Sequence, residues 1–150
     1  MVQAICDYFD DPHEFEKCAA ALWALEAAAV DYEVTRASVD GGRDAVGEYR
    51  LGLPSDPIRL TFALEAKRYE KGGVGVRELA RLISRLRHRE FGVLVTTSYV
   101  SRQAYTEIRD DKHPIIVISA ADIVAILKKH GIPDAAGVAT WLCTEFPKTQ

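Results

Sequence analysis

Two carboxylates and a lysine stand at positions where hydrolytic chemistry is feasible. Glu65 and Lys67 flank Ala66 inside the apolar run LTFALEAKRY, and Asp44 ends the turn sequence DGGRD earlier in the chain. Side chains alternate between the two faces of a strand, so Glu65 and Lys67 point to the same face. A buried strand does not ordinarily carry both charges. The combination predicts a metal-dependent phosphodiesterase site.

The residue types fit a magnesium site. Hydrolysis of a phosphodiester needs a positioned water and positive charge opposite the charge that develops on the phosphate. Mg²⁺ prefers one or two carboxylates together with waters and phosphate oxygens, which matches Asp44 and Glu65, and the carbonyl of Ala66 is a further oxygen donor. Mn²⁺ is expected to substitute. Lys67 either orients or deprotonates the water or neutralises charge, and the residues alone leave these roles open.

The triplet has a simpler interpretation when it is taken by itself. Glu65 and Lys67 can form one step of a salt-bridged ladder on an exposed strand face. The choice between the two interpretations depends on the elements that surround the triplet.

Apolar spacing and turn residues predict the elements around these residues. Helical periodicity begins at Pro12, with Asp11 as N-cap, and Ser101 and Ser119 are expected to cap two later helices. The predicted helices cover residues 12–30, 74–90, 102–109, 120–130 and 133–146. The predicted strands cover residues 31–39, 44–51, 58–69, 91–98 and 114–118, with turns at 40–42 and 52–57.

This order of elements predicts an α/β sandwich. An antiparallel front end is joined through helical crossovers to later strands, which gives a central mixed β-sheet with helices on both faces. The chain has 150 residues, of which 48% are hydrophobic and 27% charged, as in a folded globular protein. We expect a single domain over residues 1–150, with its core at about 12–132 and a C-terminal helix at 133–146.

Composition excludes several classes of protein. No run approaches the roughly eighteen apolar residues of a membrane span, so we expect a cytoplasmic protein with no membrane contact. The three cysteines are far apart without a CxxC pair, which excludes a disulfide scaffold and structural zinc. The net charge of −3 is unsuited to bulk attraction of nucleic acid. DNA affinity would come from a local patch or from another domain.

Four segments carry a resemblance to a known family: DGGRDAVGEYRLG, LTFALEAKRY, FGVLVTTSYVSRQAY and PIIVISAADIVAILKKHGI. In order and spacing they resemble the Mrr-like restriction endonuclease catalytic domain of the PD-(D/E)xK nuclease superfamily, over about residues 14–132. The resemblance implies a restriction-endonuclease-like three-layer α/β/α sandwich. It also implies that Asp44 and Glu65 are the metal carboxylates and that Lys67 is the catalytic lysine.

The family's N-terminal helix often adds an acidic residue near the metal. The resemblance places this role on Glu16, with Glu14 as the competing candidate. Tentative DNA contacts are expected from a stripe along one helix and from the junction that follows the strand FGVLVTTS, although solvated surface and helix capping explain the same residues. These candidates are Arg77, Arg81, Arg85, Ser98, Ser101, Arg102 and Gln103.

The resemblance implies a Mg²⁺-dependent DNA endonuclease of the restriction type that leaves 5′-phosphate and 3′-hydroxyl ends. The chain is expected to be the cutting part of a modular or modification-dependent enzyme that acts on double-stranded DNA. It would work as a homodimer, through the helix 134–146, or with a fused or partner recognition domain; Trp141 and Leu142 in that helix can equally belong to the core. Two alternatives remain: a structure-selective nuclease such as a junction resolvase, and a non-catalytic DNA-binding or assembly module on the same fold.

Overall fold

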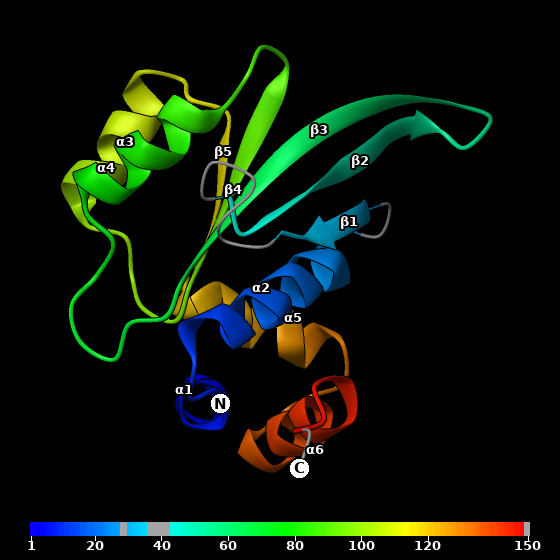
Figure 1. Ribbon diagram of the computed structural model, residues 1–150, viewed down its shortest axis with the longest axis vertical. Coiled ribbons are helices and arrows are strands. Elements are labelled where there is room, and N and C mark those ends of the chain that lie inside the picture. The colour runs from blue at the N-terminus through cyan, green and yellow to red at the C-terminus, as the bar shows by residue number, and fades with distance from the viewer. Residues whose placement is uncertain (28–29, 36–42, 149–150) are drawn as a thin grey trace.

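The computed structural model describes residues 1–27, 30–35 and 43–148. Two helices precede the first three strands, single helices separate the later strands, and two helices follow the last strand (Figure 1). The helices are α1 (Val2–Tyr8), α2 (Pro12–Glu26), α3 (Val76–Arg85), α4 (Arg102–Asp110), α5 (Ala120–Lys129) and α6 (Ala135–Glu145). The strands are β1 (Val30–Val34), β2 (Ala45–Leu53), β3 (Asp56–Lys67), β4 (Glu90–Thr96) and β5 (Ile115–Ile118).

The strands form one mixed sheet in the order β1-β2-β3-β4-β5. β1 pairs with β2 and β2 pairs with β3 in antiparallel fashion, whereas β3, β4 and β5 run parallel. Parallel neighbours need a crossover, and α3 and α4 provide the two that this order requires. The predicted hairpin and mixed sheet are therefore confirmed.

Helices cover both faces of the sheet, which gives three layers (Figure 1). α1, α2, α5 and α6 lie on one face, and α3 and α4 lie on the other. Alternation along β3 divides its side chains between these layers: Phe62 and Leu64 pack toward α2, while Ala63 packs toward α3 and α4. The predicted α/β/α sandwich is confirmed.

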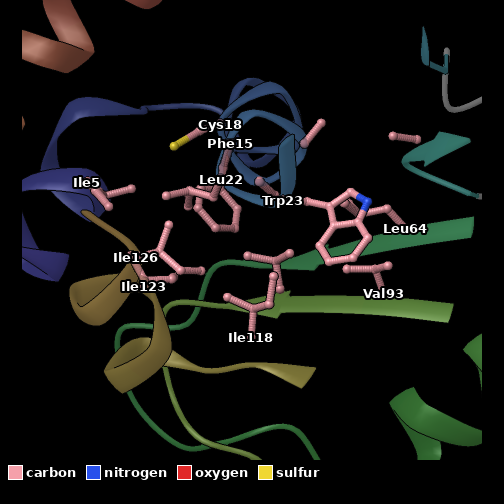
Figure 2. Close-up of a cluster of buried hydrophobic side chains, with 14 of the residues drawn as sticks. Ile5, Phe15, Cys18, Leu22, Trp23, Leu64, Val93, Ile118, Ile123 and Ile126 are labelled. Carbon is pink, nitrogen blue, oxygen red and sulfur yellow. The ribbon is translucent and has the colours of Figure 1, made fainter. Parts of the chain in front are cut away.

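The larger core lies between α2, α5 and the sheet (Figure 2). Phe15, Leu22 and Trp23 of α2 point toward the strands, where Leu64 and Val93 are completely buried. Gly47 of β2 makes this close packing feasible. A Cβ atom at Gly47 would lie 2.2 Å from the carbonyl oxygen of Asp31 and 2.8 Å from the ring of Phe62.

The predicted helix caps are confirmed. The Asp11 side chain accepts from His13 N at 3.0 Å, and the Ser101 side chain accepts from Ala104 N at 3.2 Å. Ser119 is the N-cap of α5, where its N–H donates to Asp122. These caps depend on residues within one turn of each other, so local sequence identifies them.

Some predicted boundaries are wrong. α2 ends at Glu26 rather than near Val30, because Val30 already pairs in β1. α3 ends at Arg85 rather than Glu90, because Glu90 opens β4. The last helix begins at residue 135 instead of 133. Residues 36–39 of the predicted first strand and the turn at 40–42 lie outside the described residues.

α1 precedes the expected core and was not predicted. Its Ile5 is completely buried among the residues of the larger core. Arg68, the residue after β3, donates to the carbonyl oxygens of Cys6 at 2.9 Å and Phe9 at 2.7 Å. This side chain joins the end of the strand that carries Glu65 to the C-terminal end of α1.

α6 uses its apolar face inside the chain. Val138 and Leu142 are completely buried, and Trp141 packs against the same core. Its ring also meets that of Phe146 with 5.5 Å between centroids. Leu142 is therefore a core residue, and Trp141 lies partly buried against the same core. No helix within the described ranges has the length and apolarity to cross a membrane.

Candidate active site

The register of the β2–β3 hairpin brings Asp44 beside the triplet. Ala45 pairs with Leu64, and the amide of Asp44, one residue earlier, donates to the carbonyl oxygen of Leu64 at 3.0 Å. Asp44 thus lies at the point where β2 begins, level with the last residues of β3. Asp44 and Glu65 are far apart in the sequence but lie close together in space, because the hairpin folds one strand back on the other.

The main chain of Ala66 holds the Asp44 carboxylate. The N–H of Ala66 donates to Asp44 Oδ2 at 2.7 Å. The N–H and C=O groups of one strand residue point to the same side, so the Ala66 carbonyl also points toward Asp44. The Lys67 carbonyl points to the other side, where it accepts from Thr97 N at 3.2 Å. This direction suits the predicted use of the Ala66 carbonyl as an oxygen ligand.

Glu65 is a buried carboxylate among cationic side chains. The residue is only 1% exposed, and Lys67 Nζ lies 2.8 Å from its Oε1. Glu65 and Lys67 share a strand face, as predicted. Neither Glu65 oxygen has a partner with hydrogen-bond geometry among the described residues, so Lys67 contributes charge without a well-aligned donor. A buried carboxylate with unmet acceptor capacity is the kind of ligand that a hard divalent cation takes.

Arg85, the last residue of α3, lies on the other side of Glu65. Its Nη1 atom is 3.6 Å from Glu65 Oε2, and its side chain is 18% exposed. The end of α3 is fixed by Arg43, which donates to the carbonyl of Arg85 and to Glu90 Oε2, the latter at 3.0 Å. The position of Arg85 therefore depends on how α3 is attached to the start of β4.

The structure distinguishes between the two acidic candidates on α2. The Glu16 side chain is 12% exposed, and its Oε1 lies 2.7 Å from His13 Nδ1. Burial is the largest cause that raises the pKa of Glu16, and the charge of Asp44 adds to this rise, so these two carboxyl groups are electrostatic neighbours. Glu14 is exposed and lines a separate pocket with Tyr8 and Phe146. Glu16 is thus the acidic residue of α2 on the Asp44 side.

Burial raises the pKa of two carboxyl groups in this region, those of Asp44 and Glu16. For Asp44 the largest cause is desolvation, which outweighs the hydrogen bond from Ala66 and the attraction of Lys67. The pKa of Glu16 is raised mainly by burial as well, and the hydrogen bond from His13 opposes that rise. Raised pKa values are expected where acidic groups lie close together in a partly buried space. A bound cation would offset the repulsion between these groups.

No group of three or more His, Cys, Asp or Glu side chains within the described ranges is close enough to enclose a metal ion. The available donor set is therefore Asp44, Glu65 and the main chain of Ala66. Mg²⁺ commonly binds through one or two carboxylates and completes its octahedron with water and phosphate oxygens, so this open set suits it. The residues present fit a divalent cation that is shared with a substrate.

Hydrogen bonds to Thr97 fix the end of β3. Tyr69 N donates to Thr97 Oγ1 at 2.8 Å, and that hydroxyl donates to the carbonyl of Tyr69 at 3.1 Å. Thr96 and Thr97 are both buried. These contacts hold the segment that follows Lys67 against the end of β4.

The tentative DNA-binding residues are not one surface. Arg77 and Arg81 are exposed on α3, whereas Arg85 turns toward Glu65, so the predicted stripe divides at the last turn. Ser101 serves as a cap, and the hydroxyl of Ser98 donates to the carbonyl of Gly72. Arg102 and Gln103 are exposed at the start of α4, where Gln103 contacts Glu107 at 3.3 Å. A role in DNA binding stays a prediction for all of them.

Two contacts near the centre, that of His13 with Glu16 and that of Arg85 with Glu65, were not predicted from the sequence. The spacing of His13 and Glu16, three residues apart on one helix, indicates that contact once the helix is assigned. The approach of Arg85 to Glu65 has no comparable signal, because it depends on how α3 packs across the sheet.

Comparison with known proteins agrees with this architecture. The three layers and the mixed sheet define a restriction-endonuclease-like α/β fold. The model of a restriction endonuclease family, that of Mrr-type catalytic domains, matches residues 10–127. The chain belongs to this family. A search among curated proteins found no match.

Two solved structures are similar to the chain. The DNA modification-dependent restriction endonuclease AspBHI matches with 47% identity and a TM-score of 0.88, over 96% of this chain and 38% of that one. The MspJI restriction endonuclease, solved in complex with a 27-mer oligonucleotide, matches with 28% identity and a TM-score of 0.76, over 98% and 35% of the two chains. The chain thus spans less than two fifths of either relative.

Proposed function

We propose that this chain is the Mg²⁺-dependent cutting domain of a modification-dependent restriction system. The observation that carries the proposal is the pair of carboxylates, Asp44 and Glu65, held beside Lys67 with the Glu65 oxygens buried and short of donors. Family membership and the similarity to AspBHI support it. Mn²⁺ is expected to replace Mg²⁺ at these oxygen ligands.

The proposed reaction is hydrolysis of a phosphodiester. Water oxygen forms a bond to phosphorus while the bond from phosphorus to the 3′ oxygen breaks. One water proton leaves to solvent and the 3′ oxygen gains a proton, which leaves 5′-phosphate and 3′-hydroxyl ends. When bound, the cation acidifies the water and neutralises phosphate charge.

The chain's own residues arrange the reactants. Asp44, Glu65 and the Ala66 carbonyl would supply the protein's oxygen ligands on one side of the cation. Lys67, held 2.8 Å from Glu65, neutralises charge that develops on the phosphate. Glu16 extends the acidic centre from α2, where its hydrogen bond to His13 limits its rotation.

The proposed substrate is double-stranded DNA that carries a modification. AspBHI is described as modification-dependent, and MspJI was solved with an oligonucleotide. A net charge of −3 argues that a fused or partner domain, or a second copy of the chain, supplies most of the DNA affinity. We propose that the enzyme acts in the cytoplasm, where it would encounter modified DNA.

The test is cleavage of methylated and unmethylated plasmid by the full chain in Mg²⁺. Asp44→Ala, Glu65→Gln and Lys67→Ala are each expected to reduce cleavage at least about a hundredfold, the scale for loss of a charge-stabilising group. Lys128→Ala, an exposed lysine on α5, is the matched control and keeps wild-type activity. If all three variants still cleave the plasmid at the wild-type rate, Asp44, Glu65 and Lys67 are not the catalytic site.

Branched and single-stranded DNA are included as further substrates. A preference for a four-way junction over duplex would favour a structure-selective nuclease. Absence of cleavage together with absence of Glu65-dependent Mn²⁺ binding would favour a non-catalytic DNA-binding or assembly module.

A further inference from the structure

Arg85 has a place in the candidate site that its position in the sequence does not indicate. Two cationic groups flank the Glu65 carboxylate: Lys67 Nζ lies 2.8 Å from Oε1, and Arg85 Nη1 lies 3.6 Å from Oε2. Both oxygens of a buried ligand candidate are therefore opposite positive charge before any cation arrives.

The two flanking groups differ in how tightly they hold Glu65. Lys67 lies on the same strand face two residues away, so the strand itself fixes their proximity. Arg85 reaches Glu65 from a separate layer and at a longer distance. A divalent cation at Glu65 cannot share a carboxylate oxygen with a guanidinium group at short range without strong repulsion. Arg85 is the group that can withdraw.

An open space lies where Arg85 would go. Arg85 lines a groove of about 820 Å³ together with Arg43, Arg87, Thr61 and Glu33. In this groove the Arg43 guanidinium is paired with Glu90. The Arg85 side chain is 18% exposed, so its guanidinium is within reach of solvent as well as of Glu65. A planar guanidinium is well suited to bind a phosphate through two donors.

We propose that Arg85 is a counter-ion which competes with the divalent cation for Glu65, and which moves from Glu65 to the substrate phosphate in the groove when the cation is bound. This inference rests on the proposed function and adds a second cationic residue to the site. In the metal-free protein Arg85 compensates a buried charge. In the complex with DNA it contacts a backbone phosphate that lies in the groove beside the site.

The experiment measures Mn²⁺ affinity by titration calorimetry and plasmid cleavage at saturating Mn²⁺, both on the full chain. Arg85→Met is expected to bind Mn²⁺ roughly tenfold more tightly, because one screened unit charge near the cation is gone. The same variant is expected to cleave at least about tenfold more slowly at saturation, because the phosphate has lost a cationic partner.

Further variants separate charge from folding. Arg85→Lys keeps the charge and is expected to stay within roughly threefold of the wild-type Mn²⁺ affinity. Arg85→Gln keeps polarity without charge and replaces Arg85→Met if the latter does not fold. Lys128→Met removes one positive charge from the exposed side of α5, away from Glu65, and leaves Mn²⁺ affinity and cleavage unchanged.

The outcomes are distinct. If Arg85→Met binds Mn²⁺ with unchanged or weaker affinity, Arg85 does not compete with the cation for Glu65. Arg85 then only stabilises the position of Glu65. Tighter Mn²⁺ binding with undiminished cleavage overturns the contact with phosphate. If the wild-type chain shows no Mn²⁺ binding that Glu65→Gln abolishes, the proposed function itself has failed, and the wild-type titration reveals this before any Arg85 variant is compared.

Discussion

The main-chain amide of Ala66 donates a 2.7 Å hydrogen bond to the carboxylate of Asp44. This contact fixes one carboxylate against the residue that separates Glu65 from Lys67. The three side chains of the candidate site thus depend on two adjacent strand ends, and their relative positions are set by backbone geometry more than by flexible side chains.

Asp44→Asn is expected to stabilise the metal-free protein at neutral pH. Burial raises the pKa of Asp44 above its usual value, so its ionised form is worse tolerated in the folded state than in the unfolded chain. The free energy of unfolding therefore falls as pH rises from the unfolded pKa through the folded one, and this cost persists at neutral pH.

Urea denaturation at pH 7 and at pH 4 measures this effect. We expect a gain of about 0.5–2 kcal/mol for Asp44→Asn at pH 7 and a smaller one at pH 4. The asparagine carbonyl can still accept from Ala66 N. A loss of stability at pH 7 would show that the attraction between Asp44 and Lys67 outweighs the burial cost.

His13 is expected to titrate above its ordinary pKa. Its hydrogen bond and charge interaction with Glu16 raise the pKa of His13, so the contact is fully present below the unfolded value and is lost as pH rises through the folded one. Proton NMR of the imidazole signals measures this directly. Glu16→Gln should lower the His13 midpoint, whereas the neighbouring Glu14→Gln should leave it nearly in place.

Arg68→Ala is expected to destabilise the fold by about 1.5–3 kcal/mol. The guanidinium donates to two carbonyl oxygens, those of Cys6 and Phe9, and its loss leaves partly buried acceptors without a charged donor. Urea denaturation measures the change. Arg59→Ala, whose contact with Glu48 is exposed on the hairpin, is the control and should cost less than about 1 kcal/mol.

Gly47→Ala is expected to cost more than about 1 kcal/mol, because overpacking in a dense core forces neighbours to move. The added Cβ atom would overlap the Asp31 carbonyl of β1, which is backbone and cannot rotate away. Thermal unfolding checks this. Gly131→Ala is also expected to destabilise, through its φ of +78° rather than through contact, since nothing lies within 4 Å of its added Cβ. If Gly47→Ala melts at the wild-type temperature, the packing argument is wrong.

Local signals in the sequence were sufficient for much of the fold. The caps at Asp11, Ser101 and Ser119 and the alternation that puts Glu65 and Lys67 on one face all depend on residues a few positions apart. The turn at 52–57 predicted a hairpin that brings Asp44 beside the triplet, the resemblance to Mrr-like domains supported it, and the observed register agrees with it.

Features that depend on tertiary packing were missed. α1 is short, and its place is set by the burial of Ile5 and the contacts of Arg68, which come from elsewhere in the chain. The helical period put Arg85 in line with Arg77 and Arg81. Only the way α3 ends against β4 turns Arg85 toward Glu65, and no short-range pattern encodes that contact.

The hairpin that carries the candidate site also limits how the chain can change. Asp44, Glu65 and Lys67 are brought together by one antiparallel register that runs from Ala45↔Leu64 to Leu53↔Asp56. A deletion of one residue within β3, between the turn and Glu65, would exchange the faces of every later side chain and separate Glu65 from Asp44. Extra residues at the exposed tip leave that register intact. The tip is therefore where length can vary among related chains or be engineered without loss of the site.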